Sequence, residues 1–300
     1  MNKKKRMISL SILALVCSLV LSVPLIMSQS QSQSNGYVTL SFDDGWLDNY
    51  TNAWAEMKTR NMTGVFNIVT VLLDDPRRLN VSILLELQSE GNEIASHSNT
   101  HPVFADLTEE EIRFECELSK QILLDNGLDV KDFVYPSGNK DSLLDSIVSD
   151  YYRTGRYGWG LMDLPCEDWH VYGYTSYSVT NKLGDFKNKI DEIANTGKWG
   201  ILYFHKTPLV STSVNQVSRS DFAEILDYLL EKEVEVVTMD EALNLGVEPE
   251  PPTEEPPTEP PTEMSVEEWH SFWEWLKTRQ SDIEWGNYLE AMLEKWKLGE

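Results

Sequence analysis

Two patterns of hydrophobic and polar positions alternate along the chain. Short apolar runs rich in β-branched and aromatic residues predict buried strands, and apolar residues spaced three and four positions apart predict amphipathic helices. The expected strands are 37–42, 64–69, 92–97, 133–136, 153–157, 171–174, 200–205 and 234–238. The expected helices are 46–60, 81–90, 107–126, 142–151, 185–195 and 221–232. Because strands and helices alternate, we predict an α/β fold with a parallel sheet, open or closed into a barrel, and a ligand site at the carboxyl ends of its strands.

The two ends of the chain differ from this pattern. Basic residues and then an apolar run begin the chain, so we expect residues 1–35 to be a secretory signal or an uncleaved membrane anchor, with the remainder outside the cytoplasm. Residues 36–247 hold the alternating elements, and the Pro-, Thr- and Glu-rich segment 248–263 predicts a semi-rigid linker. Residues 264–300 predict two short amphipathic helices that cannot bury much on their own. They would pack on each other or on the domain, associate with a second copy, or bind a protein or cell-envelope partner.

Charge and cysteine content narrow the classes of partner. The formal net charge of −24 argues against a nucleic-acid partner, because the phosphates would be repelled. Cys116 and Cys166 are the two cysteines of the part expected to be exported, and they permit one disulfide without establishing it.

Acidic residues and histidines follow the expected strands at two points. Asp43 and Asp44 come directly after the first strand, either as a plain Asp-Asp-Gly turn or as a pair in which one carboxylate binds a cation and the other acts as a base. His97 and His101 lie four positions apart at the end of the third strand, where a helical turn or a tight loop would let both face one cation. With Asp44 they would supply two nitrogens and one carboxylate and leave coordination positions open. Such a site suits zinc, cobalt or another first-row divalent ion.

Four motifs in this order resemble those of a known family: Ser41-Phe42-Asp43-Asp44-Gly45, His97-Ser98-Asn99-Thr100-His101, Phe133-Val134-Tyr135-Pro136-Ser137-Gly138 and Leu202-Tyr203-Phe204-His205. The family is that of the polysaccharide deacetylases, also called the NodB-homology group or carbohydrate esterase family 4, and the resemblance covers residues 37–246. It implies a distorted (β/α) barrel with fewer than eight strands, which a short C-terminal α-helical segment would follow here. It also implies metal-dependent hydrolysis of N- or O-acetyl groups on glycans.

The resemblance further implies a role for each motif residue. Three residues would hold one divalent ion, with zinc as the first choice and cobalt or nickel as alternatives: Asp44, His97 and His101. Asp43 would act as general base on a water, and His205 would protonate the leaving group. The backbone N–H of Ser137 would stabilise the oxyanion.

The chain departs from the family pattern in the third and fourth motifs. The family often has an arginine that orients the catalytic aspartate where this chain has Val134, and an aromatic residue where it has Ser137. The candidate supporting residues are Tyr135 in the third motif and, as the acid and tryptophan that could support the catalytic histidine, Asp168 with Trp169. Asp163 is the alternative acid, with Trp159 nearby. The missing arginine leaves the orientation of the expected base unexplained.

The predicted function is that of an exported, metal-dependent deacetylase whose partner is an acetylated glycan, with N-acetylhexosamine units as the expected substrate. The alternatives are an O-acetyl glycan esterase, a glycan-binding module on the same fold that has lost turnover, and a carrier whose function resides in residues 264–300. The intact set of acids and histidines favours the enzyme, because binding alone does not need a base beside a metal.

Overall fold

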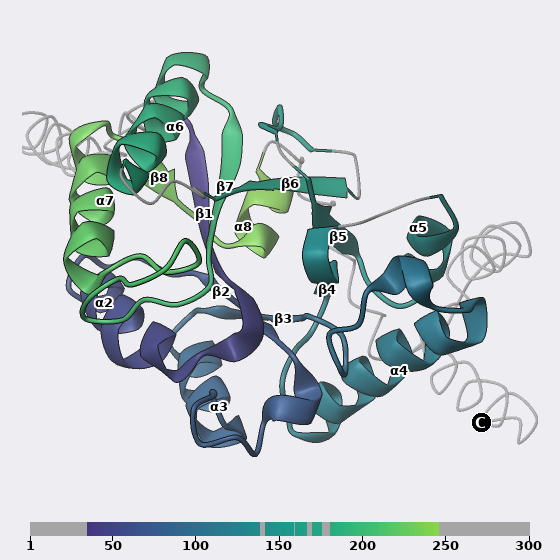
Figure 1. Cartoon of the computed structure of the whole chain (residues 1–300). Helices are drawn as coiled ribbons and strands as arrows, with labels where there is room; N and C mark the ends of the chain where they lie inside the picture. The colour runs from purple at the N-terminus through teal and green to yellow at the C-terminus, as the bar shows by residue number, and fades with distance from the viewer. Residues whose placement is uncertain (1–34, 139–141, 159, 167–169, 176–180, 246–300) are drawn as a thin grey trace, which may run out of the picture. The chain divides into compact units, whose positions relative to one another are not determined.

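A computed structural model describes residues 35–138, 142–158, 160–166, 170–175 and 181–245 (Figure 1). The linker, the helical tail and all but the last residue of the expected signal or anchor lie outside these residues, as do Asp168 and Trp169. What the sequence indicates about them remains a prediction.

Seven parallel strands close into a barrel, and an eighth pairs with its first strand. The strands are β1 (Tyr37–Phe42), β2 (Val65–Ile68), β3 (Glu93–Ser96), β4 (Asp132–Val134), β5 (Thr154–Tyr157), β6 (His170–Tyr174), β7 (Trp199–Phe204) and β8 (Glu235–Val236). Each strand from β1 to β6 pairs in parallel with the next, and β7 returns to β1 along its whole length. β2 pairs with the end of β1 and β8 with its start, so β8 lies beside the ring and not in it. The expected distorted barrel with fewer than eight strands is therefore confirmed.

Helices connect the strands and cover the outside of the barrel (Figure 1). They are α2 (Ala55–Lys58), α3 (Val81–Ser89), α4 (Glu109–Asp125), α5 (Ser142–Val148), α6 (Lys182–Thr196), α7 (Arg219–Glu231) and α8 (Met239–Asn244). The predicted helix 46–60 begins at Leu47 and runs through a π-helical stretch, Asn49–Trp54, into α2. It begins directly after Trp46 because the backbone there is extended, with φ −67° and ψ 137°.

Capping boxes begin α4 and α8. Thr108 and Glu111 exchange side-chain and backbone hydrogen bonds at the start of α4, as Thr238 and Glu241 do at the start of α8. In α4 the box places the first helical residue close to the predicted start of that helix. In α8 it ends the expected strand 234–238 early, so β8 is short and is followed by a helix that was not predicted.

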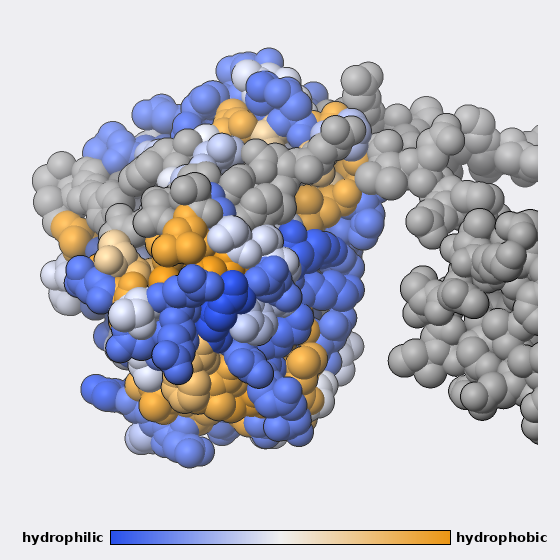
Figure 2. Space-filling model, turned by 90° about the vertical axis from the view of Figure 1, so that its right-hand side faces the viewer, coloured by the Kyte–Doolittle hydropathy of each residue, from blue (hydrophilic) through white to orange (hydrophobic). Residues whose placement is uncertain are grey.

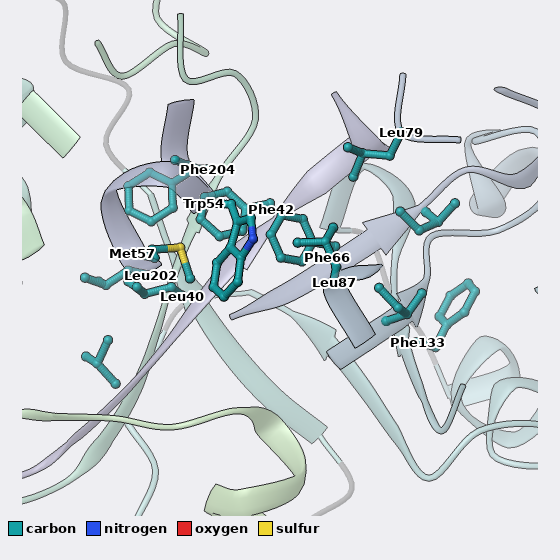
Figure 3. Packing of buried hydrophobic residues seen from close by; sticks show 14 of the residues in the cluster. Leu40, Phe42, Trp54, Met57, Phe66, Leu79, Leu87, Phe133, Leu202 and Phe204 are labelled. Atoms are coloured by element: carbon teal, nitrogen blue, oxygen red, sulfur yellow. The ribbon is translucent and has the colours of Figure 1, made fainter. Parts of the chain in front are cut away.

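Aromatic residues outside the barrel fix the end of β1 (Figure 3). The ring of Phe42 stacks on Phe66 and Phe204, with centroids 4.9 and 5.6 Å away, and meets the edge of Phe222 from α7 at 5.8 Å. All four are buried, and burying a side chain of this size contributes roughly 1.5–3 kcal/mol. Because successive side chains of a strand point to opposite faces, anchoring Phe42 against the helices turns Asp43 towards the barrel.

The interior of the barrel holds both apolar and polar side chains. One buried apolar cluster comprises Val65, Ala95, Met162, Val171, Trp199, Ile201 and Val237 with Met239 and Ala242 of α8. Near the carboxyl ends of the strands, Asn67 Nδ2 donates a hydrogen bond to Ser41 Oγ over 2.8 Å, and both residues are fully buried. This polar layer lies directly under the candidate site.

The surface shown in Figure 2 is mainly hydrophilic and carries separate apolar areas. Cys116 is buried in α4, and no disulfide joins it to Cys166. Within the described ranges, none of the helices combines the length and apolar character needed to span a bilayer.

Candidate active site

Side chains from the carboxyl ends of several strands meet in one cleft of about 350 Å³. Asp43 and Asp44 follow β1, His97 and His101 follow β3, and His205 follows β7. The cleft is also lined by Tyr135, Ser137, Gly138, Arg156, Tyr157, Gly158, Tyr203 and Asn215. The structure therefore gathers those predicted site residues that it describes at the edge of the barrel where ligands were expected.

Asp44, His97 and His101 direct one ligand atom each to a common point. Asp44 Oδ1 lies 3.8 Å from His97 Nε2 and 3.6 Å from His101 Nε2. His97 Nδ1 lies 2.8 Å from the carbonyl oxygen of Val134, a contact that fits donation from Nδ1 and an unprotonated Nε2. The three ligand atoms lie within 4.8 Å of one another, and two imidazoles with one carboxylate are a donor set that divalent first-row ions accept. The residues present therefore fit one divalent ion.

The backbone is left-handed at two of these three residues. The φ angle is 69° at Asp44 and 59° at His101, and it is 65° at Ser98 between the two histidines. A left-handed conformation costs a residue other than glycine roughly 1–2 kcal/mol, so the surrounding contacts must hold it. Of the two arrangements that the spacing of the histidines allowed, the structure has the tight loop.

Glu115 of α4 holds the histidine loop and was missed in the sequence. Its Oε2 accepts hydrogen bonds from the backbone N–H groups of Asn99 (2.9 Å) and Thr100 (2.8 Å), and its Oε1 accepts one from Thr100 Oγ1 (2.7 Å). Ser98 Oγ accepts a further bond from the N–H of His101 at 2.9 Å. A signal was present, because Glu115 falls on the buried face of an amphipathic helix, where an unpaired acid would be costly.

Trp46 holds the second oxygen of Asp44. Its Nε1 donates to Asp44 Oδ2 over 3.0 Å, which leaves Oδ1 directed to the histidines. The Arg78 guanidinium lies 3.2 Å and the Lys206 ammonium 3.5 Å from the centroid of the indole ring. Arg78 also donates to the backbone oxygen of Asp44 over 2.7 Å. Trp46 therefore orients a candidate metal ligand and is itself held by two cations.

Asp43 is almost completely buried and ionised. Its Oδ1 accepts hydrogen bonds from Arg156 Nη2 (2.5 Å) and Asn67 Nδ2 (2.7 Å), whereas Oδ2 has no hydrogen-bond partner among the described residues. Burial raises the pKa of this carboxyl, but the charge of Arg156 and two neighbouring histidines outweigh burial and lower the pKa to about 2. Asp43 can therefore accept a proton through one defined oxygen.

Arg156 supplies the arginine that the third motif lacks. The residue at the expected position is Val134 on β4, and its register partner on β5 is Arg156. Paired residues of neighbouring parallel strands face the same side, so both side chains face the interior of the barrel. Sequence reasoning left the orientation of Asp43 unexplained, and the structure explains it through an arginine on a different strand.

The two histidines near Asp43 differ in their surroundings. His97 is buried, and burial is the largest cause that lowers its pKa to about 4, so its imidazole is neutral near pH 7. His205 is partly exposed, and Asn49 Nδ2 donates to its backbone oxygen over 2.9 Å. Asp168 and Trp169, the expected supports of His205, lie outside the described residues.

Ser137 lies in a turn at the rim of the cleft. It belongs to the short 3₁₀ turn Pro136–Gly138 and has a left-handed φ of 61°. Tyr135, just before this turn, donates through its hydroxyl group to Asp145 Oδ1 of α5 over 2.9 Å. These contacts anchor the turn beside the cleft, and the oxyanion role of the Ser137 N–H stays a prediction.

Comparisons with known proteins relate part of the chain to one family. Residues 30–154 match the family described as polysaccharide deacetylase. The putative polysaccharide deacetylase YxkH of Bacillus subtilis (strain 168) is 28% identical over 102 residues, which are 34% of this chain and 36% of that protein. The chain thus matches only about a third of that relative's length.

Solved structures share the fold at low sequence identity. The T48 deacetylase with substrate has a TM-score of 0.52 and 18% identity, over 71% of this chain and 92% of that one. The Bc1960 peptidoglycan N-acetylglucosamine deacetylase has a TM-score of 0.52 and 19% identity, over 69% and 88%. The family 4 carbohydrate esterase from Streptomyces lividans has a TM-score of 0.50 and 19% identity, over 68% and 92%. These structures show a shared fold, and the match to the polysaccharide deacetylase family covers residues 30–154 of the chain.

Proposed function

We propose that this protein is a metal-dependent hydrolase that removes acetyl groups from a glycan, with N-acetylhexosamine units as its substrate. The observation that carries the proposal is the pairing of two groups in one cleft. Asp44, His97 and His101 converge with the donor set of a divalent site, and the ionised carboxyl of Asp43 lies beside them. A ligand site without catalysis would not require this second carboxylate.

The protein groups divide the proposed reaction between them. A divalent ion at the triad would polarise the acetyl carbonyl and lower the pKa of a nearby water. Asp43 would take the proton of the attacking water through Oδ2, since its Oδ1 already accepts two hydrogen bonds. His205 would then give a proton to the leaving nitrogen of the sugar, and the products are acetate and the free amine.

The oxyanion would form beside the third motif. Ser137 lines the same cleft as the triad, and a backbone N–H aimed at a developing negative charge lowers the barrier electrostatically. Tyr157 and Tyr203 also line the cleft, and their rings offer apolar surface to a sugar.

We further propose that the protein is exported through residues 1–35 and that residues 264–300 act as a tethered interaction segment. The basic and apolar N-terminal pattern and the Pro-rich linker support this arrangement. Deleting residues 264–300 should leave acetate release unchanged and alter localisation or association. Lost turnover in that deletion would contradict a pure targeting role.

Acetate release from a set of acetylated glycans tests the function. The full chain is incubated with zinc and with N-acetylglucosamine oligomers, peptidoglycan fragments or O-acetylated xylan. We expect release from the N-acetylated substrates. Release from acetyl xylan alone would move the assignment to an O-acetyl esterase. Glycan binding without release on any of them would favour the binding module.

A further inference from the structure

Arg156 crosses the inside of the barrel to reach Asp43. It begins on β5, and its guanidinium lies 4.4 Å from the centroid of the Tyr203 ring on β7. Its Nη2 ends 2.5 Å from Asp43 Oδ1, beyond β1. Both side chains of this ion pair are nearly buried, with 5% and 6% of their surface exposed.

The path of Arg156 is built by its neighbours. Gly173 on β6 lies directly beside it, and an added Cβ there would come within 3.0 Å of Arg156 Nη1 and 2.9 Å of Tyr203 Cδ1. A larger residue at position 173 would therefore displace the guanidinium or the tyrosine ring that supports it. Strands β5, β6, β7 and β1, which are consecutive in the ring, thus cooperate to bring one positive charge to one carboxylate.

We propose that Arg156 is the positioning residue of the catalytic base: it holds Oδ1 of Asp43 and thereby leaves Oδ2 as the oxygen that accepts the proton. This inference rests on the proposed deacetylase function and adds to it a residue outside the motifs. Asn67 assists by donating to the same Oδ1 over 2.7 Å. With both donors on one oxygen, rotation of the carboxylate would break two hydrogen bonds at once.

Stability alone does not account for this pair. A buried ion pair costs desolvation of both charges, and well-packed apolar residues often serve stability equally well. The chain offers a matched comparison in Arg153, which directly precedes β5. Its guanidinium contacts the fully buried Asp132 at 2.5 Å and does not line the active-site cleft. If both arginines only stabilise the barrel, removing either should have the same effect on turnover.

The test compares Arg156→Ala with Arg153→Ala in the full chain. For Arg156→Ala we expect kcat to fall about 100-fold, the loss typical of a misplaced catalytic group, with little change in KM. Guanidinium chloride at low, non-denaturing concentration should recover part of the lost kcat in this variant. Arg153→Ala should keep the wild-type kcat and show no recovery. Circular dichroism and binding of Co²⁺, followed by its visible absorption, establish that each variant is folded and retains the triad.

If folded Arg156→Ala keeps the wild-type kcat while Asp43→Asn is inactive, the inference about Arg156 is wrong. The proposed deacetylase function would still stand. Equal losses in the two arginine variants without rescue would overturn the inference too. If the wild type releases no acetate, the proposed function fails. Crystal structures of the wild type and of Arg156→Ala then still test the positioning role. The Asp43 carboxylate should turn from its wild-type orientation in Arg156→Ala, and an unchanged carboxylate would refute the inference.

Discussion

At the scale of single residues, the site depends on which oxygen of each carboxylate is already occupied. Trp46 donates a hydrogen bond to Oδ2 of Asp44, and Oδ1 of Asp44 faces the two histidines. In Asp43 it is Oδ1 that accepts hydrogen bonds, from Arg156 and Asn67. The two neighbouring carboxylates therefore differ in the oxygen that they leave available, which fits the different tasks proposed for them. This division could be proposed from the Asp-Asp pair, but the donors that enforce it come from elsewhere in the chain.

Replacing Trp46 with phenylalanine tests this division. The Trp46→Phe variant keeps an aromatic ring between Arg78 and Lys206 but loses the donor to Asp44 Oδ2. We expect zinc affinity to fall roughly 10-fold or more, as is usual when the partner of a metal ligand is removed. Titration with zinc in a calorimeter measures it. Trp54→Phe is the control, because the buried Nε1 of Trp54 has no partner among the described residues and its loss should leave zinc affinity unchanged.

At the scale of elements, α4 is part of the active site although none of its side chains lines the cleft. Glu115 on this helix accepts three hydrogen bonds from the loop that carries His97 and His101. The helix begins at a capping box, so its position is fixed locally, and the loop is then fixed by the helix. The left-handed φ at His101 is maintained by this chain of contacts.

Glu115→Gln should therefore weaken both the fold and the site. The amide keeps the shape of the carboxylate but loses its charge, and it presents a donor to backbone N–H groups. We expect the free energy of unfolding to fall by about 2 kcal/mol and zinc affinity to fall roughly 10-fold. Urea unfolding and zinc titration measure the two effects. Glu117→Gln, at an exposed position of the same helix, should change neither, and a loss as large as that of Glu115→Gln would contradict this account.

Most elements could be predicted because each is encoded locally. Strand β1 is a short run rich in β-branched and aromatic residues, and α4 lies between a Thr-x-x-Glu capping box and Gly127, which has φ of 80°. Asp44, His97 and His101 could be identified from the sequence because they lie at or shortly after the ends of predicted strands. Arg156 was not, because an arginine within a short strand looks like a solvent-facing residue, and its partner lies 113 positions away in the sequence. Register across the barrel brings the two together.

At the scale of the whole molecule, the barrel carries buried charge at both ends. Opposite the active site, Glu93 and Asp132 lie near the start of β3 and β4, and Arg153 contacts Asp132 and Asp240. Burial and then the neighbouring Asp132 raise the pKa of Glu93 well above its usual value. The folded protein therefore keeps a proton on Glu93 that the unfolded chain releases above pH of about 4.3.

The consequence is a pH-dependent loss of stability. Because the folded pKa is raised, the contribution of Glu93 declines as the pH rises from about 4 towards the folded pKa. Glu93→Gln replaces the protonated carboxyl by a neutral amide, so we expect it to equal or exceed the wild type in stability at pH 8 and to show a smaller decline above pH of about 5. Thermal unfolding across this range measures it. The exposed Glu235→Gln should follow the wild-type profile, and a Glu93→Gln variant less stable at pH 8 than at pH 5 by the wild-type margin would refute the sign.

The central claim joins one divalent ion to one separate base in the same cleft. Its most direct test is a titration of the chelator-treated full chain with zinc, in which bound zinc and acetate release from N-acetylglucosamine oligomers are measured on the same samples. We predict that release rises with the first equivalent of bound zinc, that His101→Ala loses both zinc and release, and that Asp43→Asn binds one equivalent without releasing acetate. Release that does not depend on zinc, or that persists in Asp43→Asn, would contradict the account.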